Sequence, residues 1–314
     1  MDLFSWYDTD MKREVLILST IFALSLKAAV ITPWHIEPDR YAEIPRFKIL
    51  DAKEIESKDD EKGDFSGVSG IAYDRAEKRL YAVSDFGVLY SVKMKISGGK
   101  IVKFDIKNKV RLKDAKGRPF KDKKRSDAEG LDISGGNLLI SFERGPGIAL
   151  FDRDGRMIKE LKLPKPLRKK SNYRGRNRML EAVVFHPRLG ILTAPEIPLK
   201  KEDRNRHTIY GKKVRFHMPA TGSLTAMAVT KKGNILVLER DFDPLFRRRV
   251  ITLSLLNPEN GEIRLLASLK SRDGWRLDNF EGLAHLGGDR FLMISDDNAN
   301  PLQRKIAVLF EIME

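Results

Sequence analysis

Five short runs of mostly apolar residues along the chain each end at a carboxylate. They are Leu80–Ser84 before Asp85, Leu138–Phe142 before Glu143, Ile191–Pro195 before Glu196, Ile235–Leu238 before Glu239 and Phe291–Ser295 before Asp296. A second apolar run lies about ten residues before each of them, and turn-forming residues such as Ser134–Asn137 separate the two, an arrangement typical of β-hairpins. No long stretch past residue 30 has the period of a helix. We therefore predict an all-β protein.

The paired runs recur at a spacing of roughly fifty residues, which is typical of a β-propeller built from four-stranded blades. In the second unit the four expected strands, a to d, are Gly130–Ile133, Leu138–Phe142, Ile148–Phe151 and Met157–Leu163. Counting units in this way predicts a single closed β-propeller of five blades. A sixth, degenerate blade remains an alternative at this point, although no residues are evident for it.

The last unit lacks one strand, because only Ile306–Ile312 follows Phe291–Ser295. The β-rich segment Arg46–Leu50 belongs to no unit of its own. We predict that it supplies the outer strand of the last blade, beside Ile306–Ile312, so that residues 46–314 form one domain. Closing the ring in this way would remove a free sheet edge.

Residues 1–30 have the pattern of a targeting segment. Lys12 and Arg13 precede the mostly apolar stretch Val15–Leu26, and Ala28 and Ala29 follow it, as in a secretory signal. The apolar stretch is short for a membrane span. We expect an exported protein, periplasmic or extracellular, in which residues 31–45 form a linker. An uncleaved N-terminal anchor, or an apolar element packed on the fold, is the alternative, and translation could start at Met1 or at Met11.

The amino-acid composition excludes some reactions and favours a particular kind of binding partner. The 314 residues include no cysteine, which excludes disulfides, cysteine-ligated zinc and thiol catalysis. The net charge is +15, which favours an anionic partner. No aromatic platform alternates with the basic segments, so we expect no nucleic-acid binding. We expect a monomer that binds an anionic small molecule, such as a phosphorylated one.

The geometry of a blade predicts where these carboxylates lie. Strands a and b are antiparallel, so the start of a and the end of b lie at the same edge. The acids that end the b strands are therefore expected at one mouth of the channel, together with Glu129, Glu181 and Glu281 at the starts of three a strands. Ser69 and Thr225 take the equivalent places in the other two blades.

Eight carboxylates around one axis repel each other unless they are protonated or neutralised. Ca²⁺ accepts roughly six to eight oxygen ligands in flexible geometry, so we predict a Ca²⁺ site here. Its predicted ligands are Asp85, Glu143, Glu181, Glu196, Glu239 and Asp296, and the predicted catalytic proton-transfer residues are Glu129 and Glu281. The alternative is that the acids cap turns or pair with neighbouring arginines.

Cations surround the predicted acidic centre. Basic residues are concentrated in the connections that emerge at the same mouth, above all in Lys165–Arg178. We predict that six of them bind the anionic substrate: Arg144, Lys169, Lys170, Arg174, Arg178 and Arg240. A generic basic surface on a highly charged protein is the alternative reading.

Several of these segments resemble a known family in their order along the chain. They are Phe65-Ser-Gly-Val-Ser-Gly-Ile71, Asp127-Ala-Glu-Gly-Leu131, Ser141-Phe-Glu-Arg144, Leu180-Glu-Ala182, Leu238-Glu-Arg-Asp241, Asn279-Phe-Glu-Gly-Leu-Ala284 and Ile294-Ser-Asp-Asp-Asn298. From about Arg46 to Glu314 the chain resembles the phytase-like, or "esterase-like activity of phytase", family of bacterial β-propeller proteins. The resemblance implies an exported propeller with a hydrolytic role on phosphate or ester substrates. The first blade departs from the pattern, with Ser69 where three other blades have glutamate.

Two functions are favoured by these observations, and nucleic-acid binding, which would rest on the positive charge alone, is a third and weaker alternative. One is a metal-assisted hydrolase of a phosphate-bearing or ester substrate at the acidic mouth. The other is a non-catalytic propeller that binds an anionic polymer or partner through its basic face. The Gly-x-Ser-x-Gly signature of serine esterases and the phosphate-binding P-loop are both missing from the sequence.

Overall fold

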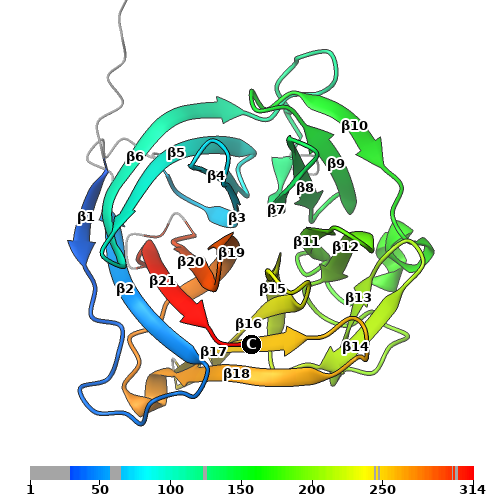
Figure 1. Cartoon of the computed structure of the whole chain (residues 1–314). Coiled ribbons are helices and arrows are strands. Elements are labelled where there is room, and N and C mark those ends of the chain that lie inside the picture. The colour runs from blue at the N-terminus through cyan, green and yellow to red at the C-terminus, as the bar shows by residue number, and fades with distance from the viewer. Residues whose placement is uncertain are drawn as a thin grey trace, which may run out of the picture.

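The protein is a five-bladed β-propeller (Figure 1). The computed structural model describes residues 29–56, 65–122, 126–243, 245–246, 248–298, 300 and 303–314. These residues form five antiparallel sheets whose first strands lie side by side around a central axis. The predicted all-β class and the count of five blades are confirmed, and the alternative of a sixth blade is wrong.

Four blades are continuous in sequence and have the strand order predicted from the repeats. The first contains β3 (Val68–Asp74), β4 (Arg79–Ser84), β5 (Val88–Ser97) and β6 (Lys100–Arg111), and the second contains β7 (Ala128–Ser134), β8 (Asn137–Phe142), β9 (Gly147–Phe151) and β10 (Met157–Leu161). The third contains β11 (Leu180–His186), β12 (Gly190–Pro195), β13 (Arg206–Tyr210) and β14 (Arg215–Pro219), and the fourth contains β15 (Ser223–Val229), β16 (Ile235–Asp243), β17 (Arg248–Leu256) and β18 (Ile263–Lys270).

The fifth blade joins the two ends of the propeller. Its strands are β19 (Asn279–Gly287), β20 (Arg290–Asp296), β21 (Ile306–Ile312), β2 (Phe47–Glu56) and β1 (Val30–Pro33). Strand β2 pairs antiparallel with β21, with Phe47 opposite Ile312 and Glu54 opposite Ile306, as the truncated last unit predicted. The stacked rings of Phe291 and Phe310, with Phe47 against Phe310, fill the core of this blade.

The N-terminal predictions have separate outcomes. The segment expected to be a linker contains β1, which pairs with β2 as a fifth, outermost strand. The predicted targeting segment lies almost entirely in residues 1–28, outside the described residues. Among the residues that the structure describes, no helix is long and apolar enough to cross a membrane. Short 3-10 turns such as Lys165–Arg168 and Ser271–Asp273 interrupt the connections between blades.

Every inner strand carries a β-bulge at the same place. The register shifts between Val68 and Gly70 in β3, and equivalent shifts occur in β7, β11, β15 and β19. A bulge leaves a residue without a cross-strand partner and turns its side chain away from the regular alternation. The bulged residues are Ser69, Glu129, Glu181, Thr225 and Glu281, the five positions that the sequence predicts to be equivalent.

A small residue follows each bulged residue, because the inner strands approach one another closely at the axis. These residues are Gly70, Gly130, Ala182, Ala226 and Gly282. A Cβ atom on Gly130 would lie 2.7 Å from the carbonyl oxygen of Glu181 and 2.8 Å from the amide nitrogen of Val183. Both atoms belong to the backbone of the neighbouring blade, so they cannot rotate away.

We expect Gly130→Ala to destabilise the propeller by about 2 kcal/mol, because the added methyl group must push two inner strands apart. The matched control is Gly175→Ala, whose Cβ would lie 3.3 Å from the Arg178 side chain in a connection between blades. Thermal unfolding followed by circular dichroism compares the two. Equal melting temperatures for both variants would show that the inner strands have room for a methyl group at position 130.

Candidate functional site

An open cavity of about 530 Å³ lies at one mouth of the propeller and is lined mainly by carboxylates. The nine acids on its wall are Asp85, Asp127, Glu129, Glu143, Glu181, Glu196, Asp241, Glu281 and Asp296. Among the residues that the structure describes, only three guanidinium groups, those of Arg144, Arg178 and Arg240, share the wall. If all these groups were ionised, negative charge would outnumber positive charge threefold, so the cavity favours cations or protons.

The acids reach the cavity from two kinds of position. Glu129, Glu181 and Glu281 are bulged residues of inner strands. Asp85, Glu143 and Glu196 directly follow the second strand of their blades, and each donates its backbone N–H to the carbonyl oxygen of the residue that precedes the inner strand, at 3.1, 3.0 and 2.9 Å respectively. Asp296 pairs with Asn279 at the equivalent place in the fifth blade.

The fourth blade breaks the ring of acids, and here the sequence prediction is wrong. Leu224 pairs with Glu239, as Phe280 pairs with Ser295 in the fifth blade, so Arg240 and not Glu239 corresponds to Asp296. A slip of one residue moves a side chain to the other face of a strand. Glu239 is fully buried away from the cavity wall, where its carboxylate accepts the N–H of Thr221 at 2.7 Å and lies 3.3 Å from Nε2 of His207.

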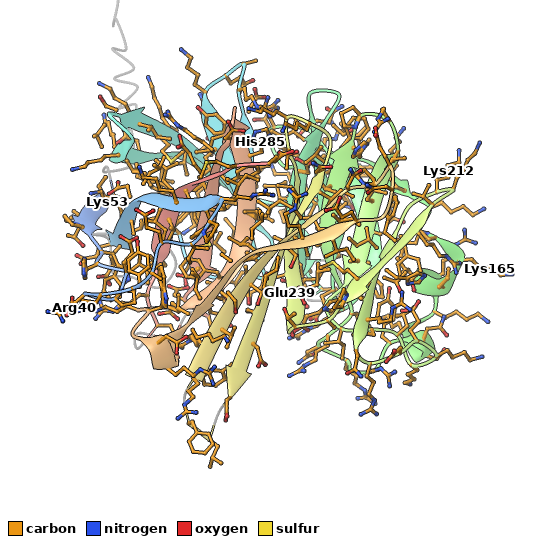
Figure 2. The ribbon with its side chains drawn as sticks, turned by 60° about the horizontal axis from the view of Figure 1, so that its bottom comes forward. Arg40, Lys53, Lys165, Lys212, Glu239 and His285 are labelled. Carbon is orange, nitrogen blue, oxygen red and sulfur yellow. The ribbon has the colours of Figure 1, made fainter. Side chains whose placement is uncertain are left out.

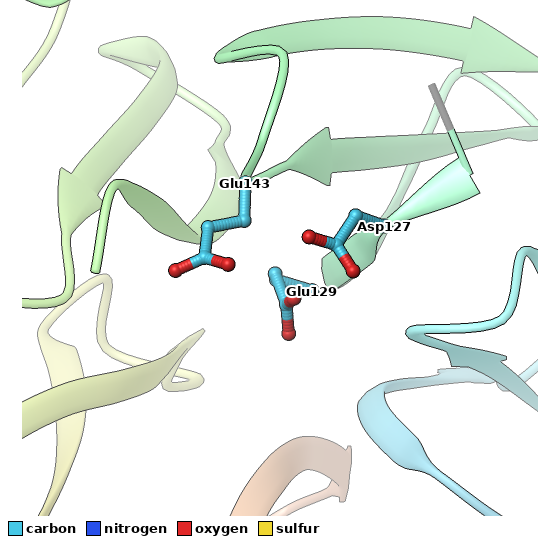
Figure 3. Close-up of side chains that lie close together, drawn as sticks. All are labelled: Asp127, Glu129 and Glu143. Carbon is cyan, nitrogen blue, oxygen red and sulfur yellow. The ribbon is translucent and has the colours of Figure 1, made fainter. Parts of the chain in front are cut away.

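Two groups of three carboxylates have oxygen atoms close enough to hold one cation each. Asp127, Glu129 and Glu143 form one group (Figure 3), and Glu143, Glu181 and Glu196 form the other; within each group the oxygens lie within 4.8 Å of one another. All five side chains are buried. Glu143 belongs to both groups, so it occupies the centre of the cluster.

Arginines neutralise two of the acids on the cavity wall. Nε of Arg144 lies 2.9 Å from Asp127, and Nη2 of Arg240 lies 2.8 Å from Glu281. The alternative that neighbouring arginines pair with the predicted acids is therefore correct for Glu281. Within the described part of the chain, no hydrogen bond or ion pair reaches the carboxylates of Glu129, Glu181 or Glu196. These three, with Glu143, are the acids whose oxygen atoms suit a cation best.

Burial and mutual repulsion change how the acids titrate. Burial, followed by the charges of Asp127 and Glu281, raises the pKa of Asp85 to about 7. Burial also raises the pKa of Glu143 to about 7 and that of Asp296 to about 8. The pKa values of Glu129 and Glu181 are raised well above the ordinary range for the same reason, reinforced by neighbouring glutamates.

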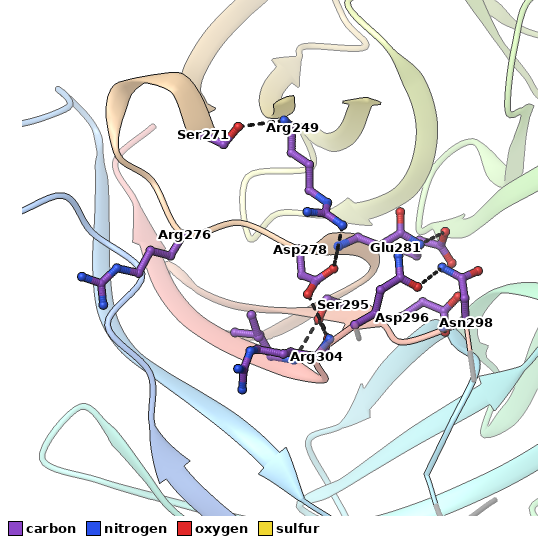
Figure 4. A network of polar contacts seen from close by, with 12 residues as sticks. Arg249, Ser271, Arg276, Asp278, Glu281, Ser295, Asp296, Asn298 and Arg304 are labelled. Atoms are coloured by element: carbon purple, nitrogen blue, oxygen red, sulfur yellow. Dashed lines mark hydrogen bonds and ion pairs between the residues drawn. The ribbon is translucent and has the colours of Figure 1, made fainter. Parts of the chain in front are cut away.

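Glu281 is in a different environment from Glu129. Burial raises the pKa of Glu281, but the charge of Arg240 and a hydrogen bond from Asn279 oppose this effect. The amide of Asn279 donates to Oε1 of Glu281 at 2.8 Å. Figure 4 shows the surrounding network, in which Asp278 accepts the backbone N–H of Arg304 at 2.9 Å and lies 3.5 Å from Arg249. The pKa of Glu281 stays raised overall, and Arg240 and Asn279 hold its carboxylate in place.

The predicted substrate-binding cations divide into two sets. Arg144, Arg178 and Arg240 line the cavity, whereas Lys169, Lys170 and Arg174 do not. Lys170 donates to the backbone carbonyl of Arg144, and Arg174 donates to the carbonyls of Pro198, Lys200 and Glu202. Lys170 and Arg174 thus lie outside the cavity wall, where each side chain links two connections between strands, and their role in substrate binding stays a prediction.

Several wall residues escaped the sequence analysis. Asp127 lies just before its inner strand, and its carbonyl accepts the N–H of Glu143 while its carboxylate faces Arg144. Its place in the sequence, two residues before the bulged Glu129, indicates a position at the same mouth. Asn177, Ser223, Phe242 and Asn298 complete the wall with neutral groups.

Fold and site together define a β-propeller with an acidic mouth. The sequence profile of the phytase-like family, described as "esterase-like activity of phytase", matches residues 63–299. This match covers well over half of the chain, so the protein belongs to that family.

Other comparisons concern architecture alone. Solved structures similar to this chain include the Dos1 propeller, with 8% identity, a TM-score of 0.38 and coverage of 83% of this chain and 73% of that one. The β-propeller domain of Cps50 (Swd1) from Myceliophteria thermophila has 12% identity, a TM-score of 0.39 and coverage of 91% and 100%. U3-55K has 6% identity, a TM-score of 0.45 and coverage of 84% and 98%. No curated protein matches the sequence.

Proposed function

We propose that the protein is an exported, divalent-cation-dependent hydrolase that acts on a phosphate-bearing or carboxylic ester at the acidic mouth. The observation that carries this proposal is the pair of carboxylate groups that share Glu143 in an open cavity. Family membership supports a hydrolytic role in general terms. Export rests on the pattern of residues 1–30.

Glu143, Glu181 and Glu196 are the best candidates to hold the cation. Hard divalent cations such as Ca²⁺ prefer carboxylate oxygens, and these three are buried, close together and not paired with arginine. Asp127 is less available, because Arg144 lies 2.9 Å from it. A bound divalent cation would polarise the ester oxygen and stabilise negative charge that develops during hydrolysis.

Glu129 is the candidate for proton transfer. It belongs to the group next to the proposed cation site, sharing Glu143 with it, and burial raises its pKa, which suits a residue that must both take up and release a proton. Glu281 is less suited, because Arg240 and Asn279 hold its carboxylate. Arg178, which is exposed on the wall, would bind the anionic part of the substrate.

A metal titration combined with an ester screen tests the proposal. We expect added Ca²⁺ to raise the melting temperature of chelator-treated protein, because a ligand that binds only the folded state stabilises it. Phosphate monoesters, a multiply phosphorylated inositol and carboxylic esters would then be offered with Ca²⁺, Mg²⁺ or Mn²⁺. Cation-dependent turnover of any one class supports the proposal, and a melting temperature unaffected by all three cations would refute the metal site.

The non-catalytic alternative has its own support in the exposed, basic connection Lys165–Arg178. If the cations stabilise the fold but no ester is hydrolysed, the ion is structural. Binding of an anionic polymer in the same preparations would then favour an anion-binding propeller.

A further inference from the structure

The hairpin formed by β16 and β17 carries an apolar tip. Leu245 is 82% exposed, Phe246 is 59% exposed and Phe242 is 46% exposed. Three of the nine large apolar side chains that are exposed among the described residues thus lie at the end of one hairpin. Single exposed apolar residues are ordinary on a protein surface, but a group of this kind marks a contact site.

The tip is shaped by its own hydrogen bonds. The carboxylate of Asp243 accepts the backbone N–H groups of Leu245 at 3.0 Å and Phe246 at 3.3 Å. These hydrogen bonds fix the turn, and they direct the carboxylate toward the backbone of the turn. The guanidinium of Arg248 lies 4.8 Å from the centre of the Phe246 ring, and that of Arg249 lies 5.3 Å from the Phe242 ring. Cations therefore lie directly beside the apolar side chains.

The hairpin also has a defined position on the propeller. Asp241 and Phe242 line the mouth cavity, so the residues beyond them extend outward from the mouth face. Figure 2 shows the hairpin projecting past the lower edge of the ring. The connection that leads into the third blade and the connection between β12 and β13 add exposed cations on this face, namely Lys169, Lys170, Arg176, Lys200, Lys201 and Arg204.

We propose that this hairpin docks the mouth face onto an anionic lipid bilayer, with Leu245 and Phe246 inserted at the level of the headgroups. Apolar and aromatic side chains flanked by arginine suit the boundary between headgroups and acyl chains. A protein partner of stable affinity needs an interface of about 1,000 Å² or more, whereas a projecting turn offers only a narrow apex. The exposed cations of the third blade would be attracted to anionic headgroups on the same face.

The proposal predicts a local signal at the tip. In the full-length chain carrying F246W, vesicles of phosphatidylglycerol and phosphatidylcholine whose lipids are brominated near the headgroup should quench the introduced tryptophan. The matched control is L265W, because Leu265 is also 59% exposed but lies on the outer strand β18. Fluorescence of the unsubstituted chain is subtracted from both, which removes the contribution of the other tryptophans and of residues 1–28.

A second measurement compares affinities. L245S/F246S should weaken partition onto the anionic vesicles about tenfold, and L265S should leave it unchanged. Vesicles of phosphatidylcholine alone, or high salt, should weaken binding of the unsubstituted protein. The proposal is overturned if F246W and L265W are quenched equally or if the double variant binds as well as the unsubstituted protein. It is also overturned if the F246W signal depends on protein concentration without vesicles, since the tip would then contact another protein molecule.

Discussion

Glu143→Gln should lower cation-dependent hydrolysis by about 100-fold or more, while Glu239→Gln should leave it nearly unchanged. Both glutamates end an apolar run in the same sequence pattern, so a reading of the sequence alone gives them one role. The structure separates them, because Glu143 belongs to both carboxylate groups and Glu239 lies off the cavity wall with Thr221 and His207. Steady-state kinetics on the substrate found by the ester screen provide the comparison.

The same pair of variants has a distinct effect on stability. Replacing Glu143 removes one negative charge from a crowded cavity, so the metal-free protein should become more stable near pH 8. The gain in melting temperature on adding Ca²⁺ should shrink in that variant, because a shared oxygen ligand is altered. If Glu143→Gln retained both turnover and the full response to Ca²⁺, the cation would have to bind elsewhere.

The metal-free protein should be most stable near pH 5 and should lose stability as the pH rises to about 8. The pKa of Glu143 is raised to about 7 and that of Asp296 to about 8, whereas both groups lose their protons below pH 5 in the unfolded chain. Between these limits the folded protein binds more protons than the unfolded one, so raising the pH favours unfolding. The expected loss is on the order of 3 kcal/mol, or about 5 °C in melting temperature.

Saturating Ca²⁺ should flatten this pH dependence, since the cation replaces the protons that the folded state would otherwise keep. Below about pH 4 a different set of acids becomes important. Burial would raise the pKa values of Asp74 and Asp105, but their basic partners lower both, and their protonation costs stability in acid. A melting temperature that rises steadily from pH 5 to pH 8 without any cation would contradict the description of the cavity.

The fold could be predicted from the sequence because each of its main features produces a local sequence pattern. Alternation and turn residues mark the strands, and the missing strand of the last unit together with Arg46–Leu50 marks the closure. The short strand β1 left no such mark, because it has four residues, ends at Pro33 and adds only to an outer edge.

The site was less accessible, because it depends on register and on long-range contacts. Glu239 and Arg240 are adjacent, and only the pairing of Leu224 with Glu239 decides which of them faces the cavity. The sequence likewise shows the charge of Lys170 and Arg174 but not the carbonyl groups, distant in sequence, to which they donate. Three of the bulged positions, in contrast, were marked by a glutamate followed by a small residue.

The pairing of β2 with β21 forms the seam that closes the ring, and this seam affects how the protein folds and how fast it unfolds. These strands lie at opposite ends of the described sequence, so β2 must wait for its partner until all four continuous blades have been synthesised. Pairing over such a separation carries a high entropic cost of loop closure and forms slowly. Once formed, it cannot open without exposing the apolar core of the fifth blade. We therefore expect the seam to set the rate at which the intact ring unfolds, and hence how long each molecule resists proteases.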